Sequence, residues 1–137
     1  TQRDAGSFLP EDFIPLEEPR WQLVDGEKPI IKGMELLVLP GHSLDTQGVL
    51  IHAGDEKVAF LGDLTPTRHH LSWMWIAAYD LHPTQSLESK RRILPRAVRE
   101  KWLCVMGHDN EVPAGTLVEA DRGEVGIIKD DRFVDPY

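Results

Sequence analysis

The sequence lacks features that would place it in several specialised classes of protein. Cys104 is its single cysteine, which excludes an internal disulfide framework and favours a reducing, cytoplasmic compartment. No stretch reaches the roughly 18 consecutive apolar residues of a membrane span, and no signal peptide is visible at the N-terminus. The formal charge of −8 argues against nucleic acid or an anionic membrane as the main partner, because both would repel the chain.

The chain begins with Thr1 rather than methionine, as a processed or truncated piece of a longer protein would. Residues 1–19 contain three prolines among acidic residues, so we expect an extended segment rather than a helix or a central strand. The apolar fraction of 41% is ordinary for a globular protein, and no internal repeat or linker is visible. We therefore interpret residues 1–137 as a single partial domain.

Short apolar runs separated by glycine and aspartate predict an antiparallel sheet of the meander type. Adjacent apolar residues at positions 36–39 predict that the sheet is covered on both faces. The expected strands are residues 21–24, 34–39, 48–52, 57–61, 103–106, 116–119 and 125–128.

A helix is predicted over about residues 84–102, with Thr84 as its N-cap. One apolar stripe marks its buried side, and Pro95 predicts a kink near residues 91–95 because proline removes a main-chain hydrogen bond. Basic residues crowd the remaining surface, and we interpret them as a solvated face rather than an anion site. The stripe consists of Leu87, Leu94, Val98 and Trp102; the basic residues are Lys90, Arg91, Arg92, Arg96, Arg99 and Lys101.

Three of the apolar runs end in a glycine followed by a potential metal ligand. These ligands are His42, Asp63 and His108. Each alone is ordinary, since a histidine or aspartate at such a position is more often a turn or capping residue. Their shared setting predicts that the three strand ends converge, and two imidazoles with a carboxylate between them suit a pair of metal ions.

At this point the sequence resembles the metallo-β-lactamase superfamily. Residues 39–43 (LPGHS), followed by Gly48, resemble its PGHT/S turn, which carries a zinc-binding histidine. Residues 60–63 (FLGD) resemble its GD motif, whose aspartate bridges both metals, and residues 107–109 (GHD) resemble its last motif. The order and separations match over roughly residues 20–112. A looser likeness over residues 80–92 is to the lactonase and organophosphate-hydrolase branches.

The resemblance implies a fold and a chemistry. Members are αβ/βα sandwiches of two similar halves, and this chain looks like the C-terminal half. Two zinc ions, or iron or manganese, would activate a hydroxide against an ester, lactone, amide or phosphoester. Asp63 would bridge the ions in the catalytic centre, while His42 and His108 would each hold one. The aromatic residues Trp73, Trp75 and Tyr79 fit a substrate-lining role and core packing equally well. His52, His69, His70 and His82 are expected in loops or at the surface.

One departure from the family concerns the metal ligands. The HxHxDH motif that precedes the PGHT/S turn in the family is missing, since no histidine precedes His42. Each ion would keep only two protein ligands, too few for the usual catalytic site. The resemblance thus implies a metallo-hydrolase that is active only when the missing half is supplied, by an N-terminal fragment of the same protein or a second copy. The alternative is a non-catalytic, truncated or degenerate assembly module.

Overall fold

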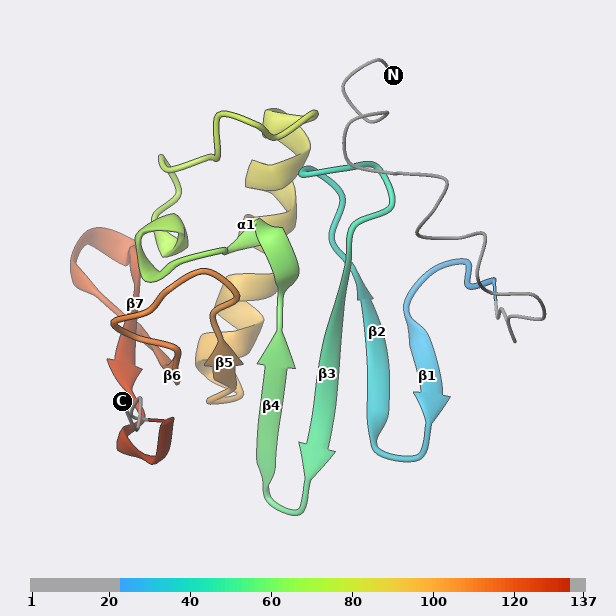
Figure 1. Cartoon of the computed structure of the whole chain (residues 1–137), viewed down its shortest axis with the longest axis vertical. Helices are drawn as coiled ribbons and strands as arrows, with labels where there is room; N and C mark the ends of the chain where they lie inside the picture. Colours follow the sequence, from blue (N-terminus) through green and yellow to red (C-terminus); the bar gives the residue numbers. More distant parts are fainter. Residues whose placement is uncertain (1–22, 134–137) are drawn as a thin grey trace.

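The computed structural model describes residues 23–133, which form one seven-stranded sheet with a single α-helix packed on it (Figure 1). The strands lie in the sheet in sequence order, and all neighbours are antiparallel except the parallel pair β4–β5. The strands are β1 (Lys28–Ile31), β2 (Met34–Val38), β3 (Gln47–Ala53), β4 (Glu56–Phe60), β5 (Leu103–Val105), β6 (Ala114–Glu119) and β7 (Val125–Lys129). The helix α1 spans Pro83–Arg99, and short 3-10 helices are Gly62–Leu64, Arg68–Leu71, Asp121–Gly123 and Asp131–Phe133.

Six of the seven predicted strands are confirmed to within about two residues. The exception is the predicted first strand at residues 21–24, of which residues 21 and 22 lie outside the described part of the chain. Residues 23 and 24 are not in a strand, and the edge strand is β1 instead. Strand β1 contains Pro29, which an edge strand tolerates because one side of its backbone needs no partner. The extended segment expected at residues 1–19 also lies outside the described residues.

The parallel pair β4–β5 explains why three strand ends meet. Because β2, β3 and β4 alternate in direction, β2 and β4 point the same way, and β5 runs parallel to β4. The carboxyl ends of β2, β4 and β5 therefore lie at one edge of the sheet (Figure 1). The connection from β4 to β5 contains α1, as parallel neighbours require a long crossover.

Helix α1 is shorter than predicted at its carboxyl end. It begins at Pro83, with His82 rather than Thr84 as N-cap, since proline fits the first helical position. It ends at Arg99 because Lys101 takes a positive φ of 55°, and the Trp102 amide then donates to the Ala97 carbonyl oxygen at 2.9 Å. Pro95 lies within α1, which continues past it to Arg99.

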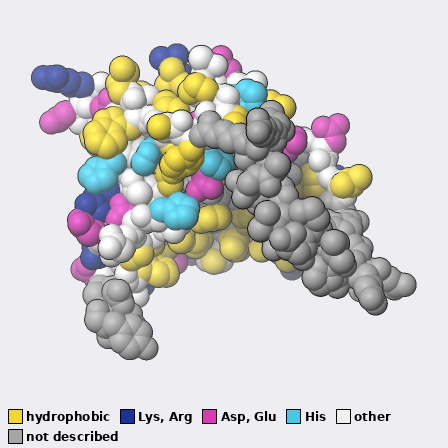
Figure 2. All heavy atoms as spheres, turned by 45° about the horizontal axis from the view of Figure 1, so that its top comes forward, with side chains coloured by type: hydrophobic (Ala, Val, Ile, Leu, Met, Phe, Trp, Pro, Cys, Tyr) yellow, Lys and Arg dark blue, Asp and Glu magenta, His cyan; other side chains and the backbone are white. Residues whose placement is uncertain are grey.

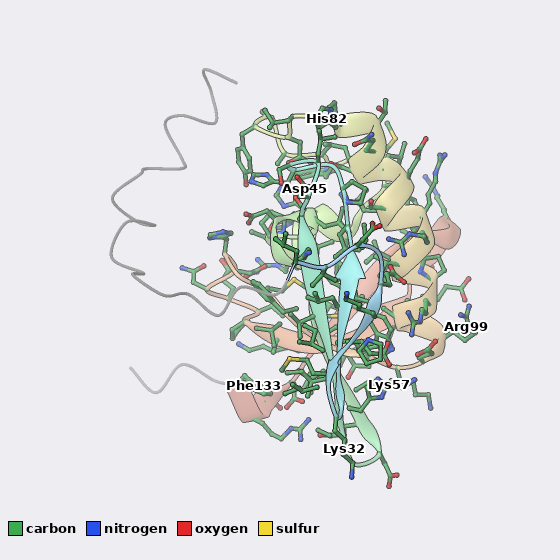
Figure 3. All side chains as sticks on the ribbon, turned by 90° about the vertical axis from the view of Figure 1, so that its right-hand side faces the viewer. Lys32, Asp45, Lys57, His82, Arg99 and Phe133 are labelled. Atoms are coloured by element: carbon green, nitrogen blue, oxygen red, sulfur yellow. The ribbon has the colours of Figure 1, made fainter. Side chains whose placement is uncertain are left out.

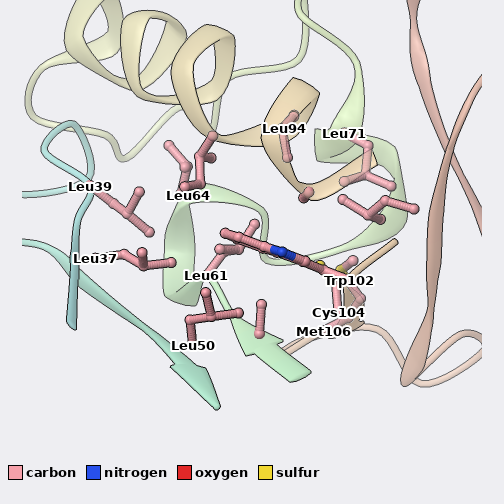
Figure 4. Packing of buried hydrophobic residues seen from close by; sticks show 14 residues of the cluster. Leu37, Leu39, Leu50, Leu61, Leu64, Leu71, Leu94, Trp102, Cys104 and Met106 are labelled. Atoms are coloured by element: carbon pink, nitrogen blue, oxygen red, sulfur yellow. The ribbon is translucent and has the colours of Figure 1, made fainter. Parts of the chain in front are cut away.

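The core lies between α1 and one face of the sheet (Figure 4). Leucines from β2, β3 and the crossover pack there around the fully buried Trp102. Of the predicted stripe, Leu94 and Trp102 lie in the core and Val98 packs against it, whereas Leu87 is only partly buried. The buried residues of α1 itself are Ser86, Ser89, Lys90, Ile93, Leu94 and Ala97. Lys90 contradicts the expectation that the basic residues are solvated, because only 1% of its surface is exposed.

The opposite face of the sheet carries two cross-strand rows of residues that are apolar except for Thr116. One row, in pairing register, is Leu36, Val49, Phe60, Val105 and Ala114; the other is Met34, Ile51, Val58, Leu103, Thr116 and Ile128. We call them the apolar rows. The prediction of a sheet covered on both faces is wrong for the described residues, since Ile51, Phe60 and Ile128 are exposed there. Within residues 23–133 no helix is long and apolar enough to cross a membrane.

Candidate metal centre

The structure brings His42, Asp63 and His108 together at the edge where β2, β4 and β5 end. The Asp63 carboxylate lies between the two imidazoles. Its Oδ2 is 3.5 Å from His42 Nε2, and its Oδ1 is 3.1 Å from His108 Nε2. Each oxygen thus faces a different histidine. Side chains of histidine, among hydrophobic and acidic ones, gather on this edge in Figure 2.

The turn before His42 is pressed against the start of α1. A Cβ added at Gly41, which has a φ of +150°, would stand 2.5 Å from the Ser86 Cα. Only glycine fits such an approach. The Ser89 hydroxyl donates to the Pro40 carbonyl oxygen at 2.7 Å, and the Leu81 amide donates to that of His42 at 3.1 Å. Helix α1 and the chain before it therefore fix the height of His42 above the sheet.

A buried carboxylate orients the His42 ring. Asp80 Oδ1 lies 3.2 Å from His42 Nδ1, and the Ser86 hydroxyl donates to Asp80 Oδ2 at 2.5 Å. With Nδ1 as the donor, the unprotonated Nε2 faces Asp63, which is the arrangement common behind metal-binding histidines. The sequence interpretation did not assign this role to Asp80. The available signal was an acidic residue in an apolar stretch, since a buried carboxylate needs partners.

Asp63 is presented by a tight turn after β4. Gly62 has a φ of +56°, a left-handed conformation that suits glycine, and it opens the 3-10 helix Gly62–Leu64. The Thr65 amide closes this turn on the Gly62 carbonyl oxygen at 3.4 Å. The Asp63 side chain is 37% exposed, so its carboxylate remains open to solvent and to ions.

The His108 loop is held by the next residue, Asp109. The buried Asp109 carboxylate accepts from the amides of Arg68, Glu111 and Val112 and forms an ion pair with Arg68 at 2.6 Å. Burial alone would raise the pKa of Asp109, but these amides and the Arg68 charge together lower it. The His108 amide also donates to the Pro66 carbonyl oxygen at 2.9 Å. The sequence identifies Asp109 only as part of the GHD motif, which does not indicate this structural role.

The three candidate aromatic residues lie in different places. The Tyr79 ring meets the His42 ring edge to face, with centroids 5.5 Å apart. Burial, then the charges of Asp63 and Asp80, raise the pKa of Tyr79. Trp75 is exposed and stacks on His69, with centroids 5.7 Å apart. Trp73 packs against the core, and its indole N–H donates to the Gly123 carbonyl oxygen at 3.0 Å.

The other histidines are loop or surface residues, as expected. His52 is exposed and paired with Glu35 at the far end of β3, and His69 is exposed beside Trp75. His70 shares a hydrogen bond with Thr67, and its pKa is lowered by burial and by the nearby Lys90 charge. His82 precedes α1; Figure 3 shows it at the same end of the molecule as Asp45, opposite Lys32.

The donor set fits half of a dinuclear metal site. In a tetrahedral zinc site with bonds near 2.0–2.1 Å, two donor atoms stand about 3.3 Å apart. The separations of 3.5 and 3.1 Å from Asp63 to His42 and His108 lie on either side of that value. Each pair supplies two ligands, whereas catalytic zinc sites use three protein ligands. Consistently, no group of three or more His, Cys, Asp or Glu within residues 23–133 is arranged to hold one ion.

No family model and no curated protein matches this sequence. Solved structures do match it. A probable metal-dependent hydrolase from Staphylococcus aureus is 26% identical, with a TM-score of 0.69 over 82% of this chain and 41% of its own. AidC, a dizinc quorum-quenching lactonase, is 18% identical, with a TM-score of 0.75 over 96% of this chain and 46% of its own. AbOPH, a hydrolase in the beta lactamase superfamily, is 18% identical, with a TM-score of 0.67 over 84% of this chain and 38% of its own.

These matches agree with the motifs at the three strand ends. The chain spans less than half the length of each of these solved structures. The comparison therefore confirms the resemblance: this chain has the fold of about one half of a hydrolase of the metallo-β-lactamase superfamily.

Proposed function

We propose that this chain supplies one half of the active site of a zinc-dependent hydrolase that cleaves an ester, lactone or phosphoester. The observation that carries the proposal is the Asp63 carboxylate, which directs one oxygen to His42 and the other to His108. A carboxylate in this position suits a bridge between two ions. The description of AidC as a dizinc lactonase supports zinc, although iron and manganese accept the same ligand types.

Bound zinc would supply Lewis acidity toward the carbonyl or phosphoryl group and would acidify a water nucleophile. The residues of this chain hold the geometry. Asp80 keeps the Nε2 of His42 toward Asp63, and Asp109 fixes the loop of His108. The Tyr79 phenol beside His42 is protonated at neutral pH, as tyrosine ordinarily is, so it can donate a hydrogen bond to a substrate oxygen there.

The missing ligands must come from a partner, and we propose an N-terminal fragment of the same protein. The apolar rows are the surface that fits it. They run across six strands on the face away from α1, and the row through Phe60 lies close to the strand ends that carry Asp63. An apolar surface of several hundred Å² on a soluble protein marks an interaction site, and a second sheet would cover it. A second copy of the chain is the competing occupant.

Metal binding tests the site. Equilibrium dialysis against zinc, followed by metal analysis, should find up to two equivalents on the chain, bound more weakly than in a complete site because each ion has two protein ligands. The variants His42→Ala and Asp63→Ala should each lower that content. His52→Ala is the matched control, because His52 also pairs with a carboxylate but lies at the other end of β3.

Metal-free protein, with stability unchanged by His42→Ala and Asp63→Ala, would contradict the hydrolase and favour the non-catalytic assembly module. The partner is tested separately by sedimentation. Phe60→Glu, in the middle of the apolar rows, should abolish association, whereas Arg91→Glu on the exposed side of α1 should not. A sharply monomeric species near 15.5 kDa would refute the docking surface, provided that no polypeptide is missing from the preparation.

A further inference from the structure

The side chain of Lys90 is buried beneath the segment of residues 72–80, which leads to the site. Only 1% of the Lys90 surface is exposed, although it carries an ammonium group. Its Nζ donates to the Trp75 carbonyl oxygen at 2.5 Å and to the Ser72 carbonyl oxygen at 3.3 Å. No carboxylate within the described residues forms an ion pair with Lys90 within 4.0 Å. Burying a charged group is costly unless it is hydrogen-bonded, and here the partners are two carbonyl oxygens of the loop.

The segment held by Lys90 has little regular structure of its own. Between Ser72 and Leu81 its main-chain hydrogen bonds are the turns closed by the Trp75 and Asp80 amides, and the Trp73 side chain ties it to Gly123. At its far end, Tyr79 contacts the His42 ring and Asp80 holds the His42 Nδ1. The Leu81 amide then donates to the His42 carbonyl oxygen.

We propose that Lys90 is a positioning residue: by binding the carbonyl oxygens of Ser72 and Trp75, it sets the segment of residues 72–80 and thereby the contacts that Tyr79 and Asp80 make with His42. The chain of contacts runs from the middle of α1, through the segment, to the metal-binding edge. That the segment serves hydrolysis rests on the proposed function. The anchoring itself does not, and it is measurable without metal or substrate.

The anchor is sensitive to protons. Burial lowers the pKa of Lys90 from 10.5 to about 8, against the opposing effect of the acidic groups that face it, Asp80 in the segment and Glu124 in the β6–β7 turn. His70 also faces it and, with its own lowered pKa, is neutral above pH 7. If the segment lifts, Lys90 reaches water and regains its ordinary pKa. Opening is therefore coupled to proton uptake by Lys90, and closure becomes more favourable as pH rises above 8.

Amide hydrogen exchange across pH measures this coupling on the intact chain. After correction for intrinsic exchange rates, the protection of the amides of Trp75, Asp80 and Leu81 should rise about 25-fold between pH 7 and 9.5. The pH range stops at 9.5 because the pKa of Tyr79 is raised above its ordinary value, so Tyr79 stays protonated over most of this range. Amides in the β2–β3 pair serve as the internal reference, and their protection should not follow this curve.

Two variants separate anchoring from general stability. Lys90→Met keeps the length of the side chain without a titrating group, and the pH-dependent rise should disappear. Lys57→Met, which removes a lysine paired with Glu100 away from the segment, should retain it. If Lys90→Met does not fold, the titration of the Lys90 ¹³Cε resonance in the wild type, with a midpoint near 8, takes its place.

The proposal is overturned if wild-type protection of the segment is flat from pH 7 to 9.5, or if Lys90→Met shows the same rise. It is also overturned if Trp75 responds and Leu81 does not, since Lys90 would then hold only the near end of the segment and would not position His42.

Discussion

Gly41→Ala should destabilise the chain more than an ordinary glycine substitution in a turn. The new Cβ would stand 2.5 Å from the Ser86 Cα and 2.6 Å from the Ser86 nitrogen. These are main-chain atoms in the first turns of α1, so no side-chain rotation relieves the contact. Such overpacking typically costs about 1–3 kcal/mol, and the φ of +150° adds strain of about 1–3 kcal/mol. We therefore expect a loss of about 2–6 kcal/mol in the free energy of unfolding.

Urea denaturation measures this loss, with Gly54→Ala as the matched control. Gly54 also has a positive φ, of +66°, but a Cβ there would meet nothing within 4 Å. The control should lose only the left-handed backbone term, about 1–2 kcal/mol. The excess loss in Gly41→Ala isolates the contact between the His42 turn and α1. Equal losses in the two variants would refute the argument that this close approach positions His42.

Three further predictions concern the scaffold. The hydrogen bond from Lys57, with those from Trp102 and Arg96, lowers the pKa of Glu100 from 4.5 to about 2. The stabilisation that these bonds give is therefore present above pH 4.5 and is lost as pH falls toward 2. Acid denaturation of Glu100→Gln should lack this loss, which is at most about 3 kcal/mol before solvent screening. Trp102→Ala should cost about 3–5 kcal/mol in urea denaturation, because the ring is fully buried in the core, and a loss below 1 kcal/mol would contradict that packing. Asp109→Ala should leave buried amides unpaired at a cost of about 1–3 kcal/mol and speed hydrogen exchange in residues 107–112; unchanged exchange there would show that Asp109 does not hold the His108 loop.

The strands were predictable because local apolar patterns determine them, and the three ligands because each follows a glycine at the end of an apolar run; their convergence depends on the parallel pairing of β4 with β5. A glycine that must take a left-handed turn, such as Gly62, marks where β4 ends and Asp63 is presented. The apolar runs then place the strands to within about two residues. The end of α1 was not predictable from its apolar stripe, because Trp102 is buried but lies beyond the turn that Lys101 makes.

The residues that support the site were harder to predict, because their roles depend on contacts distant in sequence. Lys90 was expected among solvated basic residues, and its burial follows from the way residues 72–80 cross over α1. In the sequence Asp80 cannot be told from other acidic loop residues, because its contact with His42 joins positions 38 residues apart. A single sequence shows the type of each side chain but not which carbonyl or imidazole will face it.

The parallel pairing of β4 with β5 has a consequence for the order of folding. Strands β1 to β4 form a meander of local contacts, so His42 and Asp63 can approach each other early. His108 follows β5, which pairs with β4 only after the whole crossover with α1 has closed, and such long-range closure is slow. A chain emerging from the ribosome would therefore bring Asp63 beside His42 before it brings His108 there. A metal ion that arrives at that stage would find the ligands of only one side of the Asp63 carboxylate.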